Sequence, residues 1–171
     1  MLGWRLCRRP HADLDGEGAR RFGGRWNSPG RPVVYLAEHP ALATLEVRVH
    51  LDLPLELLPA DYVLMQVQVP DTMTNQTISN LTGSHPTGSH QTGSHQTGSH
   101  QAAVPADTVS VGNAWLAEAR EPVLRVPSIL VPHAWNILLN PRHAEAGRTR
   151  VIAVEPFRFD PRLWRPSANE G

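Results

Sequence analysis

The sequence contains no lysine, so each of its sixteen lysine-or-arginine positions is an arginine. A Walker-type phosphate loop, a Schiff-base enzyme and a lysine general base all need the missing amine, and these classes are excluded. Acidic residues also number sixteen, which makes the formal net charge zero. The chain therefore lacks the excess positive charge that is typical of nucleic-acid-binding proteins, and we expect no direct contact with nucleic acid.

Cysteine and long apolar runs are also scarce. The single cysteine, Cys7, excludes an internal disulfide and fits a reducing compartment. No apolar run reaches membrane-spanning length, and Arg8 and Arg9 interrupt the N-terminal segment before the hydrophobic region of a signal peptide develops. We expect a cytoplasmic protein without membrane contact, and a length of 171 residues predicts one domain.

One segment is of low complexity: residues 82–101 read Thr-Gly-Ser-His-Pro followed by three copies of Thr-Gly-Ser-His-Gln. Such a polar stretch buries too little apolar surface to offset the entropy of ordering it. We predict an inserted surface loop at about residues 74–103, within a single domain that covers residues 1–171. The regular histidines suit weak metal chelation, but no cysteine or carboxylate completes a site, and we expect no metal.

The remaining sequence mixes helix and strand patterns without regular alternation. This predicts an α+β fold rather than a doubly wound sheet. Helices are predicted at residues 40–51 and 107–120, the second weakened by Gly112 and Asn113, whereas the glycine- and arginine-rich residues 13–31 are predicted to be loop. Strands are predicted at residues 3–7, 33–37, 62–69, 124–131, 151–154 and 157–159.

The first predicted helix carries a carboxylate on its apolar side. Leu42, Leu45 and Val49 follow the helical period and define the expected buried stripe. Glu46 falls in the middle of that stripe, whereas Arg48 is expected to face outward. Burying a carboxylate costs free energy unless it is paired or used. A buried salt bridge to an arginine and a functional role are both open at this point.

The segment from Gly16 to Gly30 is rich in glycine and arginine. Its glycines allow backbone amides to approach a ligand closely. Arg20, Arg21 and Arg25 offer guanidinium groups that suit phosphate oxygens. The segment is not a dinucleotide fingerprint, because Arg21 stands in the place of the third glycine. A solvated surface loop is the alternative interpretation.

Tyr35 lies in the strand predicted just before the first helix, on the same strand face as Val33. A tyrosine in this position is usually part of the core, with its hydroxyl group hydrogen-bonded. If it lies near Glu46 and Arg25, its ring is also suited to covering a flat heterocycle.

Polar residues reappear in an apolar setting between residues 126 and 141. Ser128 lacks the Gly-x-Ser-x-Gly surroundings of a serine hydrolase nucleophile. Asn136 and Asn140 are interpreted as side chains that satisfy backbone groups at turns, and Asn140 directly precedes a proline.

These residues belong to a recurring order of motifs. In chain order the motifs are Trp4-Arg5, Gly23-Gly-Arg-Trp-Asn-Ser-Pro-Gly30, Val34-Tyr-Leu-Ala-Glu38, Ala43-Thr-Leu-Glu46, Pro127-Ser128, Asn136 and Leu139-Asn-Pro141. Together they resemble the RES domain family, which is named for arginine, glutamate and serine positions. The resemblance covers nearly the whole chain except the histidine-rich insert.

The resemblance implies an ADP-ribosyltransferase-like fold and a bacterial toxin that uses NAD as its substrate, without a metal. NAD would be depleted by hydrolysis or phosphorolysis, or its ADP-ribosyl group would be transferred to a target protein. The implied partner is an antitoxin with an Xre-type helix-turn-helix region, and homodimers are among the implied assemblies. A catalytically degenerate module that binds only an antitoxin or another protein is the alternative.

The resemblance also assigns roles. Glu46 would stabilise the positive charge on ribose while the bond to nicotinamide breaks. Arg25 and Arg5 would hold the phosphate side of the dinucleotide, Tyr35 would stack on nicotinamide, and Ser128 would orient the ribose. The positions that match the family's active site are Arg5, Arg25, Tyr35, Glu46 and Ser128, with Asn140 as a further NAD-binding position.

Overall fold

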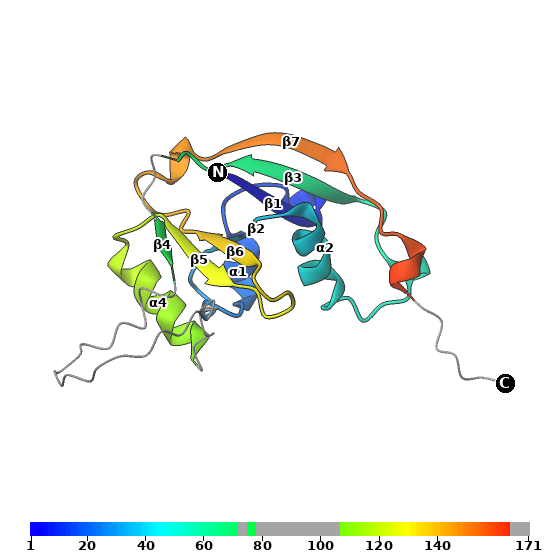
Figure 1. Cartoon of the computed structure of the whole chain (residues 1–171), viewed down its shortest axis with the longest axis horizontal. Coiled ribbons are helices and arrows are strands. Elements are labelled where there is room, and N and C mark those ends of the chain that lie inside the picture. Colours follow the sequence, from blue (N-terminus) through cyan, green and yellow to red (C-terminus); the bar gives the residue numbers. More distant parts are fainter. Residues whose placement is uncertain (72–74, 78–106, 165–171) are drawn as a thin grey trace, which may run out of the picture.

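A computed structural model describes residues 1–71, 75–77 and 107–164 of the chain (Figure 1). In this part of the chain a seven-stranded sheet has the order β4-β5-β6-β2-β1-β3-β7. Neighbouring strands are antiparallel, except that β4 runs parallel to β5. The strands are β1 (Leu2–Arg8), β2 (Val34–Ala37), β3 (Tyr62–Gln68), β4 (Asn75–Thr77), β5 (Val123–Pro127), β6 (Trp135–Leu139) and β7 (Arg150–Pro156).

The helices lie against the sheet or between its strands, as the α+β prediction requires. Four short 3-10 helices, η1 to η4, connect elements within the described residues. The α-helices are α1 (Glu17–Phe22), α2 (Pro40–Arg48) and α4 (Thr108–Glu118), and the 3-10 helices are η1 (Arg9–His11), η2 (Leu55–Leu57), η3 (Ala146–Arg148) and η4 (Pro161–Leu163).

Most predicted elements are confirmed, but several predictions differ from the structure. The strand predicted at residues 124–131 ends at Pro127. The segment 13–31 is not all loop, because it contains α1. Strand β6 was not predicted, and residues 157–159 leave the sheet so that Phe159 packs edge-on against Tyr62. The predicted loop 74–103 begins too early, because residues 75–77 pair with β5; its other residues lie outside the described ones.

The sheet divides between β1 and β2. These strands pair only at Trp4 and Ala37, whereas β1 pairs with β3 along its whole length. Figure 1 accordingly shows β1, β3 and β7 running together, with β4, β5 and β6 turned at an angle to them. On one face the two parts of the sheet enclose a core of Val34, Leu36, Val63, Met65, Val67, Val69, Val123, Ile137 and Leu139.

Helices α2 and α4 both cover the opposite face of the sheet. Helix α2 packs over β1 and β2 through Leu42 and Ala43. Helix α4 packs through Trp115 against β5 and β6, in a cluster that also contains Trp26 and Val33. Because the two helices cover different ends of this face, the sheet between them is left open.

The buried side of α2 differs from the predicted stripe. His39 caps the helix by accepting a hydrogen bond from the Ala41 amide through Nδ1, at 3.2 Å, and Pro40 begins it. Leu42 is buried, but Leu45 and Val49 are 38% and 48% exposed, so that part of the stripe is wrong. The fully buried residues of the helix, Leu42 and Ala43, lie in its first turn, and Val47 in the next turn is partly buried against the same cluster.

The prediction that Arg48 faces outward is also incomplete. Its guanidinium carbon lies 4.1 Å from the centre of the Trp164 ring. Its Nη1 donates to the Leu51 carbonyl at 3.1 Å, and its Nε donates to the Leu163 carbonyl at 3.2 Å. Arg48 therefore anchors the C-terminal part of the described chain to the end of α2.

Candidate active site

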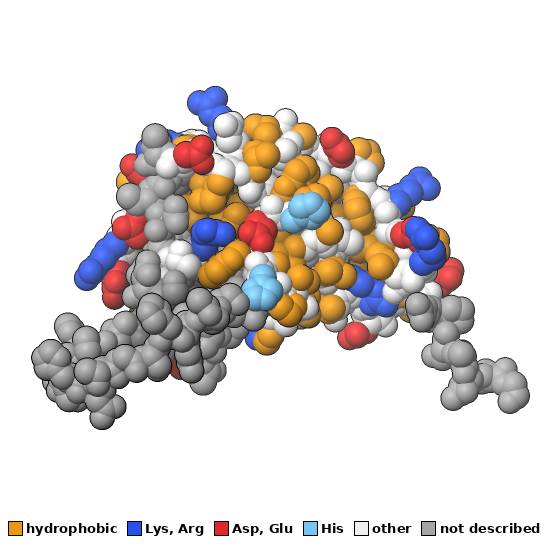
Figure 2. Space-filling model, in the orientation of Figure 1, with side chains coloured by type: hydrophobic (Ala, Val, Ile, Leu, Met, Phe, Trp, Pro, Cys, Tyr) orange, Lys and Arg blue, Asp and Glu red, His pale blue; other side chains and the backbone are white. Residues whose placement is uncertain are grey.

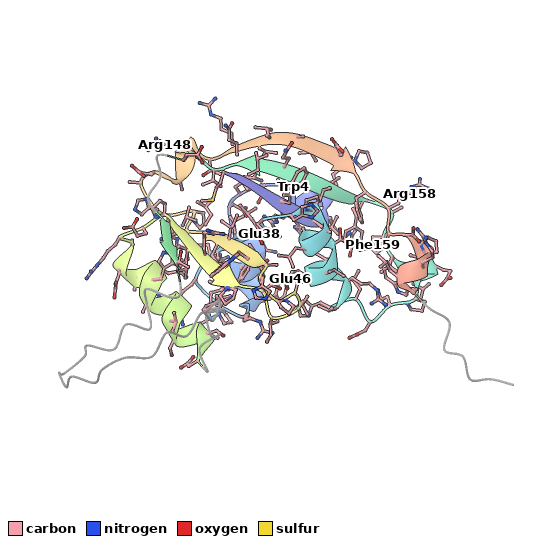
Figure 3. All side chains as sticks on the ribbon, in the orientation of Figure 1. Trp4, Glu38, Glu46, Arg148, Arg158 and Phe159 are labelled. Carbon is pink, nitrogen blue, oxygen red and sulfur yellow. The ribbon has the colours of Figure 1, made fainter. Side chains whose placement is uncertain are left out.

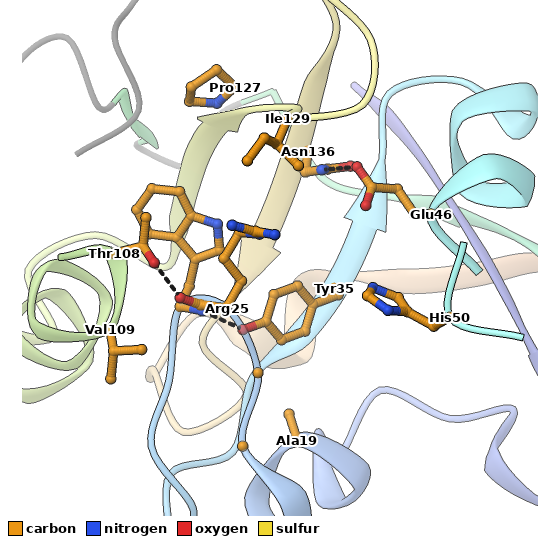
Figure 4. A pocket seen from close by; sticks show the side chains of 13 residues that line it. Ala19, Arg25, Tyr35, Glu46, His50, Thr108, Val109, Pro127, Ile129 and Asn136 are labelled. Atoms are coloured by element: carbon orange, nitrogen blue, oxygen red, sulfur yellow. Dashed lines mark hydrogen bonds between the residues drawn. The ribbon is translucent and has the colours of Figure 1, made fainter. Parts of the chain in front are cut away.

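The open part of the sheet between α2 and α4 forms a cavity of about 680 Å³. This volume falls within the range of roughly 300–1,000 Å³ that is usual for ligand sites. Figure 4 shows Tyr35 and Asn136 between Glu46 and His50 on one side and Thr108 and Val109 of α4 on the other. The lining residues are Ala19, Gly23, Gly24, Arg25, Trp26, Tyr35, Glu46, His50, Thr108, Val109, Pro127, Ile129 and Asn136.

A second cavity, of about 260 Å³, adjoins the first and shares Tyr35, Glu46, His50 and Asn136 with it. It is also lined by β1 and β2 residues, at the place where these strands separate. Arg5 of β1 lines this second cavity and donates from Nη1 to the Asp13 carbonyl at 2.7 Å. The two cavities thus form one cleft, and Arg5, Arg25, Tyr35 and Glu46 all line it.

Glu46 enters the cleft from the inner side of α2. Leu42, Glu46 and His50 are spaced four residues apart and therefore share one side of the helix. Leu42 contacts the sheet in the first turn, whereas Glu46 and His50 in the later turns line the cleft. The prediction of an inward-facing carboxylate is right, although the apolar stripe that suggested it is not.

Two side chains satisfy the Glu46 carboxylate, and neither is an arginine. Its Oε1 atom accepts a hydrogen bond from Asn136 Nδ2 at 2.6 Å and another from Ser128 Oγ at 3.0 Å. No ion pair to Glu46 occurs within residues 1–71, 75–77 and 107–164. The salt-bridge interpretation of this carboxylate is therefore wrong for the described chain.

The hydroxyl group of Ser128 can donate in only one direction. Its Oγ accepts from the amides of Leu130 and Val131, at 3.1 and 3.2 Å. A serine hydroxyl has one hydrogen and two acceptor lone pairs, so the remaining hydrogen is directed to Glu46. Ser128 is 4% exposed and is absent from the lining of both cavities, so it contacts Glu46 rather than the open cleft.

The glycine–arginine segment forms the wall opposite Glu46. Asn27 Nδ2 donates to the carbonyls of Ala19, Ser28 and Arg31, at 2.9, 3.2 and 2.8 Å. Thr108 of α4 donates to the Arg25 carbonyl at 2.6 Å, which fixes the backbone while leaving the guanidinium free to point into the cleft (Figure 4). The segment is therefore held in place by hydrogen bonds, and the interpretation as a solvated surface loop is wrong.

Arg20 and Arg21 do not share this position. Both bond to Glu17, with Nε distances of 2.6 and 2.8 Å. These two guanidinium groups lower the pKa of Glu17 to about 2. Of the three arginines predicted to suit phosphate, only Arg25 lines the larger cavity.

Tyr35 combines both of its predicted roles. Its hydroxyl accepts from the Trp26 amide at 3.0 Å and donates to Asn27 Oδ1 at 2.7 Å, while its ring lines both cavities. Burial raises the pKa of Tyr35 to about 12, so the hydroxyl stays neutral at physiological pH and cannot act there as a base. Gly24 is required beside it, because an added Cβ would lie 2.7 Å from the Tyr35 oxygen.

Tyr35→Phe is expected to destabilise the fold while keeping the ring in the cleft. The substitution leaves the Trp26 amide without its acceptor, which costs about 1–3 kcal/mol in unfolding free energy. Chemical denaturation measures this loss, and Tyr62→Phe, in the chain's other tyrosine, serves as the matched control. An unchanged unfolding free energy in Tyr35→Phe would show that the hydroxyl does not stabilise the glycine–arginine segment around Trp26 and Asn27.

Asn140 is the one predicted site residue that lies elsewhere. It lines a separate cavity of about 100 Å³ with Arg31 and Arg142, and its Oδ1 accepts from the Arg142 amide at 3.0 Å. Asn136 takes part in the site instead, because β6 directs it toward Glu46. The turn interpretation is thus supported for Asn140 and wrong for Asn136.

Comparison with known proteins identifies the family. The RES domain matches residues 2–160. The toxin Res of Pseudomonas putida is 37% identical over 164 residues, covering 96% of this chain and all of the relative. A Prs ADP-ribosylating toxin of Sphingobium is 36% identical over 155 residues, covering 90% of this chain and 88% of the relative.

A solved structure shares the fold. The M. tuberculosis MbcT–MbcA toxin–antitoxin complex contains a chain that aligns with a TM-score of 0.63 and 20% identity, covering 95% of this chain and 85% of that one. This similarity shows that the two chains share one fold, and the described chain has the predicted α+β class. No helix in the described part of the chain is long and apolar enough to cross a membrane.

Proposed function

The chain belongs to the RES domain family, and from that premise we propose that it is the toxin of a toxin–antitoxin pair and cleaves NAD at the bond between nicotinamide and ribose. The observation that carries the proposal is the cleft itself. A carboxylate held by two donors stands at one side, an arginine at the other, and an aromatic ring between them.

The proposed reaction breaks the bond between ribose C1′ and the ring nitrogen of nicotinamide. The electron pair leaves with nicotinamide, which is neutral after departure, and positive charge develops on the ribose. Water, phosphate or a protein side chain then supplies the electron pair for the new bond to C1′ and loses a proton. Because the leaving group is already activated by its cationic ring, the protein's task is to position the substrate and stabilise the ribose charge.

The residues of the cleft suit these tasks. The Glu46 carboxylate would accept hydrogen bonds from the ribose hydroxyls and offset the charge on the ring. Arg25 and Arg5 would contact the pyrophosphate, since guanidinium groups bind phosphate oxygens in two-point geometry. Tyr35 would stack on nicotinamide, and Ser128 would act through Glu46, to which it donates.

An antitoxin partner follows from the same family membership. The named relatives are toxins, and the structural neighbour was solved as a toxin–antitoxin complex. Figure 2 shows hydrophobic side chains over much of the face in view. Leu45 and Val49 are exposed beside Glu46, and Ile129 at the cavity is 55% exposed. Exposed apolar surface of this kind is typical of a protein-binding site, and we assign it to an antitoxin of the Xre type.

The test is to incubate the purified chain with NAD and to identify the products by chromatography and mass spectrometry. Release of nicotinamide is expected, accompanied by ADP-ribose, by its phosphorylated form when phosphate is present, or by a mass increase on a target protein. No nicotinamide release with any of these acceptors would contradict the proposal and favour a module that only binds a partner.

Arg25→Gln is expected to weaken NAD binding by about tenfold or more, because a charge-assisted contact to phosphate is lost. The effect should appear mainly as a higher KM, measured by nicotinamide release over a range of NAD concentrations. Arg158→Gln is the matched control, since Arg158 is exposed and lies at the end of the molecule away from α4 (Figure 3). Equal KM values for both variants would remove Arg25 from the NAD site.

A further inference from the structure

We propose that Asn136 is a positioning residue that fixes which oxygen of Glu46 faces the substrate, an inference that rests on the proposed function. Asn136 Nδ2 and Ser128 Oγ both donate to the same atom, Glu46 Oε1. Within the described residues, Oε2 forms no hydrogen bond and is left for the ribose hydroxyls. The carboxylate is thereby divided into an oxygen held by the protein and an oxygen presented to NAD.

The surroundings of Asn136 support a role directed at Glu46 rather than at the fold. Its side chain forms no hydrogen bond to a backbone group in the described chain, and its bond to Glu46 is the one it makes there. By contrast, Asn27 donates to the carbonyls of Ser28 and Arg31, and Asn140 accepts from the Arg142 amide, so both bond to nearby backbone groups. An asparagine that stabilised only the local fold would be expected to behave as these two do.

The position in the sheet explains how the contact arises. Asn136 stands opposite Ala37 in β2 and opposite Val126 in β5. Ala37 is buried with Leu42 and Ala43 of the first turn of α2, and the next turn carries Glu46 to Asn136 on β6. A short amide on β6 can then reach the helix, and the 2.6 Å distance is that of a strong, charge-assisted hydrogen bond.

Asn136→Ala is the first variant. It removes the donor, and Glu46 Oε1 is then held by Ser128 alone, which allows the carboxylate to rotate. Displacing a catalytic group by about 1 Å is enough to cost on the order of a hundredfold in rate. We expect kcat for nicotinamide release to fall by about that factor while KM changes little. An unchanged kcat would overturn the proposal.

The pH dependence of activity in Asn136→Asp distinguishes a positioning role from a purely structural one. Two carboxylates at hydrogen-bond distance share one proton, and the protonated form of the pair restores a donor to Oε1. The activity of this variant relative to wild type should therefore rise as pH is lowered from 8 to 5. The other titratable groups that line the two cavities, Arg5, Cys7, Arg25, Tyr35 and His50, are the same in both proteins, and the ratio of the two activities isolates the effect of the new carboxyl group.

The control for added negative charge is Gln68→Glu, at an exposed end of β3 outside both cavities. Its activity ratio to wild type should not depend on pH. A pH-independent ratio for Asn136→Asp, whether activity is kept or lost, would overturn the proposal. Thermal unfolding of each variant shows whether any loss of activity comes from loss of the fold.

Crystal structures of wild type and Asn136→Ala separate this proposal from the proposed function. We expect Glu46 to keep its bond to Ser128 in the variant and to turn its other oxygen away from the cleft. This comparison requires no activity. If wild type releases no nicotinamide, the proposed function is wrong. If the Glu46 carboxylate keeps its position in Asn136→Ala, the positioning role of Asn136 is wrong, whatever the activity.

Discussion

Glu46→Gln is expected to reduce nicotinamide release by on the order of a hundredfold or more while leaving the fold intact. The amide keeps an oxygen that accepts from Ser128 and Asn136, so the two hydrogen bonds at Oε1 are retained. The second oxygen is replaced by an NH₂ group, which donates where the ribose hydroxyls need an acceptor. The negative charge that offsets the developing positive ribose is lost at the same time.

Glu38→Gln is the matched control for this substitution. Glu38 is a second carboxylate near the cleft, and its Oε1 accepts from the Trp135 amide at 2.8 Å (Figure 3). It lines neither cavity, and its nearest charged partner is Arg125 at 3.6 Å. We expect Glu38→Gln to retain most NAD cleavage. Full activity in a folded Glu46→Gln protein, measured as nicotinamide release, would remove Glu46 from the mechanism.

Gly112→Ala is expected to have the largest effect on stability. An added Cβ would lie 1.9 Å from the Trp26 carbonyl oxygen and 2.8 Å from its carbonyl carbon. The obstructing atoms belong to the backbone and cannot rotate away. Helix α4 must therefore move away from the glycine–arginine segment that forms the wall opposite Glu46. Overpacking of this kind costs about 3 kcal/mol or more in unfolding free energy when the neighbour cannot yield. Denaturant titration of the purified variant measures the loss.

The same displacement should also weaken NAD binding. Helix α4 holds the wall through the Thr108 bond to the Arg25 carbonyl and through the Asn113 bonds to Ser28. Gly147→Ala is the control, because no atom of the described residues lies within 4 Å of an added Cβ there. We expect Gly147→Ala to have the same denaturant midpoint of unfolding as wild type. A Gly112→Ala protein as stable as wild type would show that α4 and the wall are not in close contact.

The role of Gly112 could not be predicted from the sequence. A glycine within a helix lowers the intrinsic helix propensity, and the sequence therefore predicts a weak helix at 107–120. The helix forms because Asp107 caps it, with Oδ1 accepting from the Ser110 amide at 2.9 Å, and because Trp115 is buried against the sheet. The glycine is needed for a long-range contact with Trp26, which no local pattern reveals.

Helical periodicity correctly predicts that Glu46 faces inward, but it wrongly predicts that Leu45 and Val49 are buried. The four-residue spacing from Leu42 places Glu46 inward in any helix, so that conclusion does not depend on which other positions are buried. Leu45 and Val49 stay exposed, whereas Leu42, Ala43 and Val47 pack in the cluster that joins the helix to the sheet. Which positions of a helix meet the sheet is a tertiary property, and the apolar pattern alone does not contain it.

The partners of Glu46 could be predicted only in part. The family resemblance assigns Ser128 to the site, and its hydroxyl group donates to Glu46. From the sequence, Asn136 is interpreted as a side chain that satisfies backbone groups at a turn, yet it lies in a central strand of the sheet. Strand β6 lies between β2 and β5 and pairs with both, and such long-range pairing leaves little trace in its five residues of sequence.

The central claim is that Glu46 and Arg25 face each other across the NAD site between β1, β2 and the two helices. A crystal structure of the chain with a carbocyclic NAD analogue, which cannot be cleaved at C1′, tests it most directly. We predict the nicotinamide ribose hydroxyls within hydrogen-bond distance of Glu46 Oε2, and the pyrophosphate beside Arg25. An analogue bound outside this cleft, or bound in it without contact to Glu46, would contradict the account.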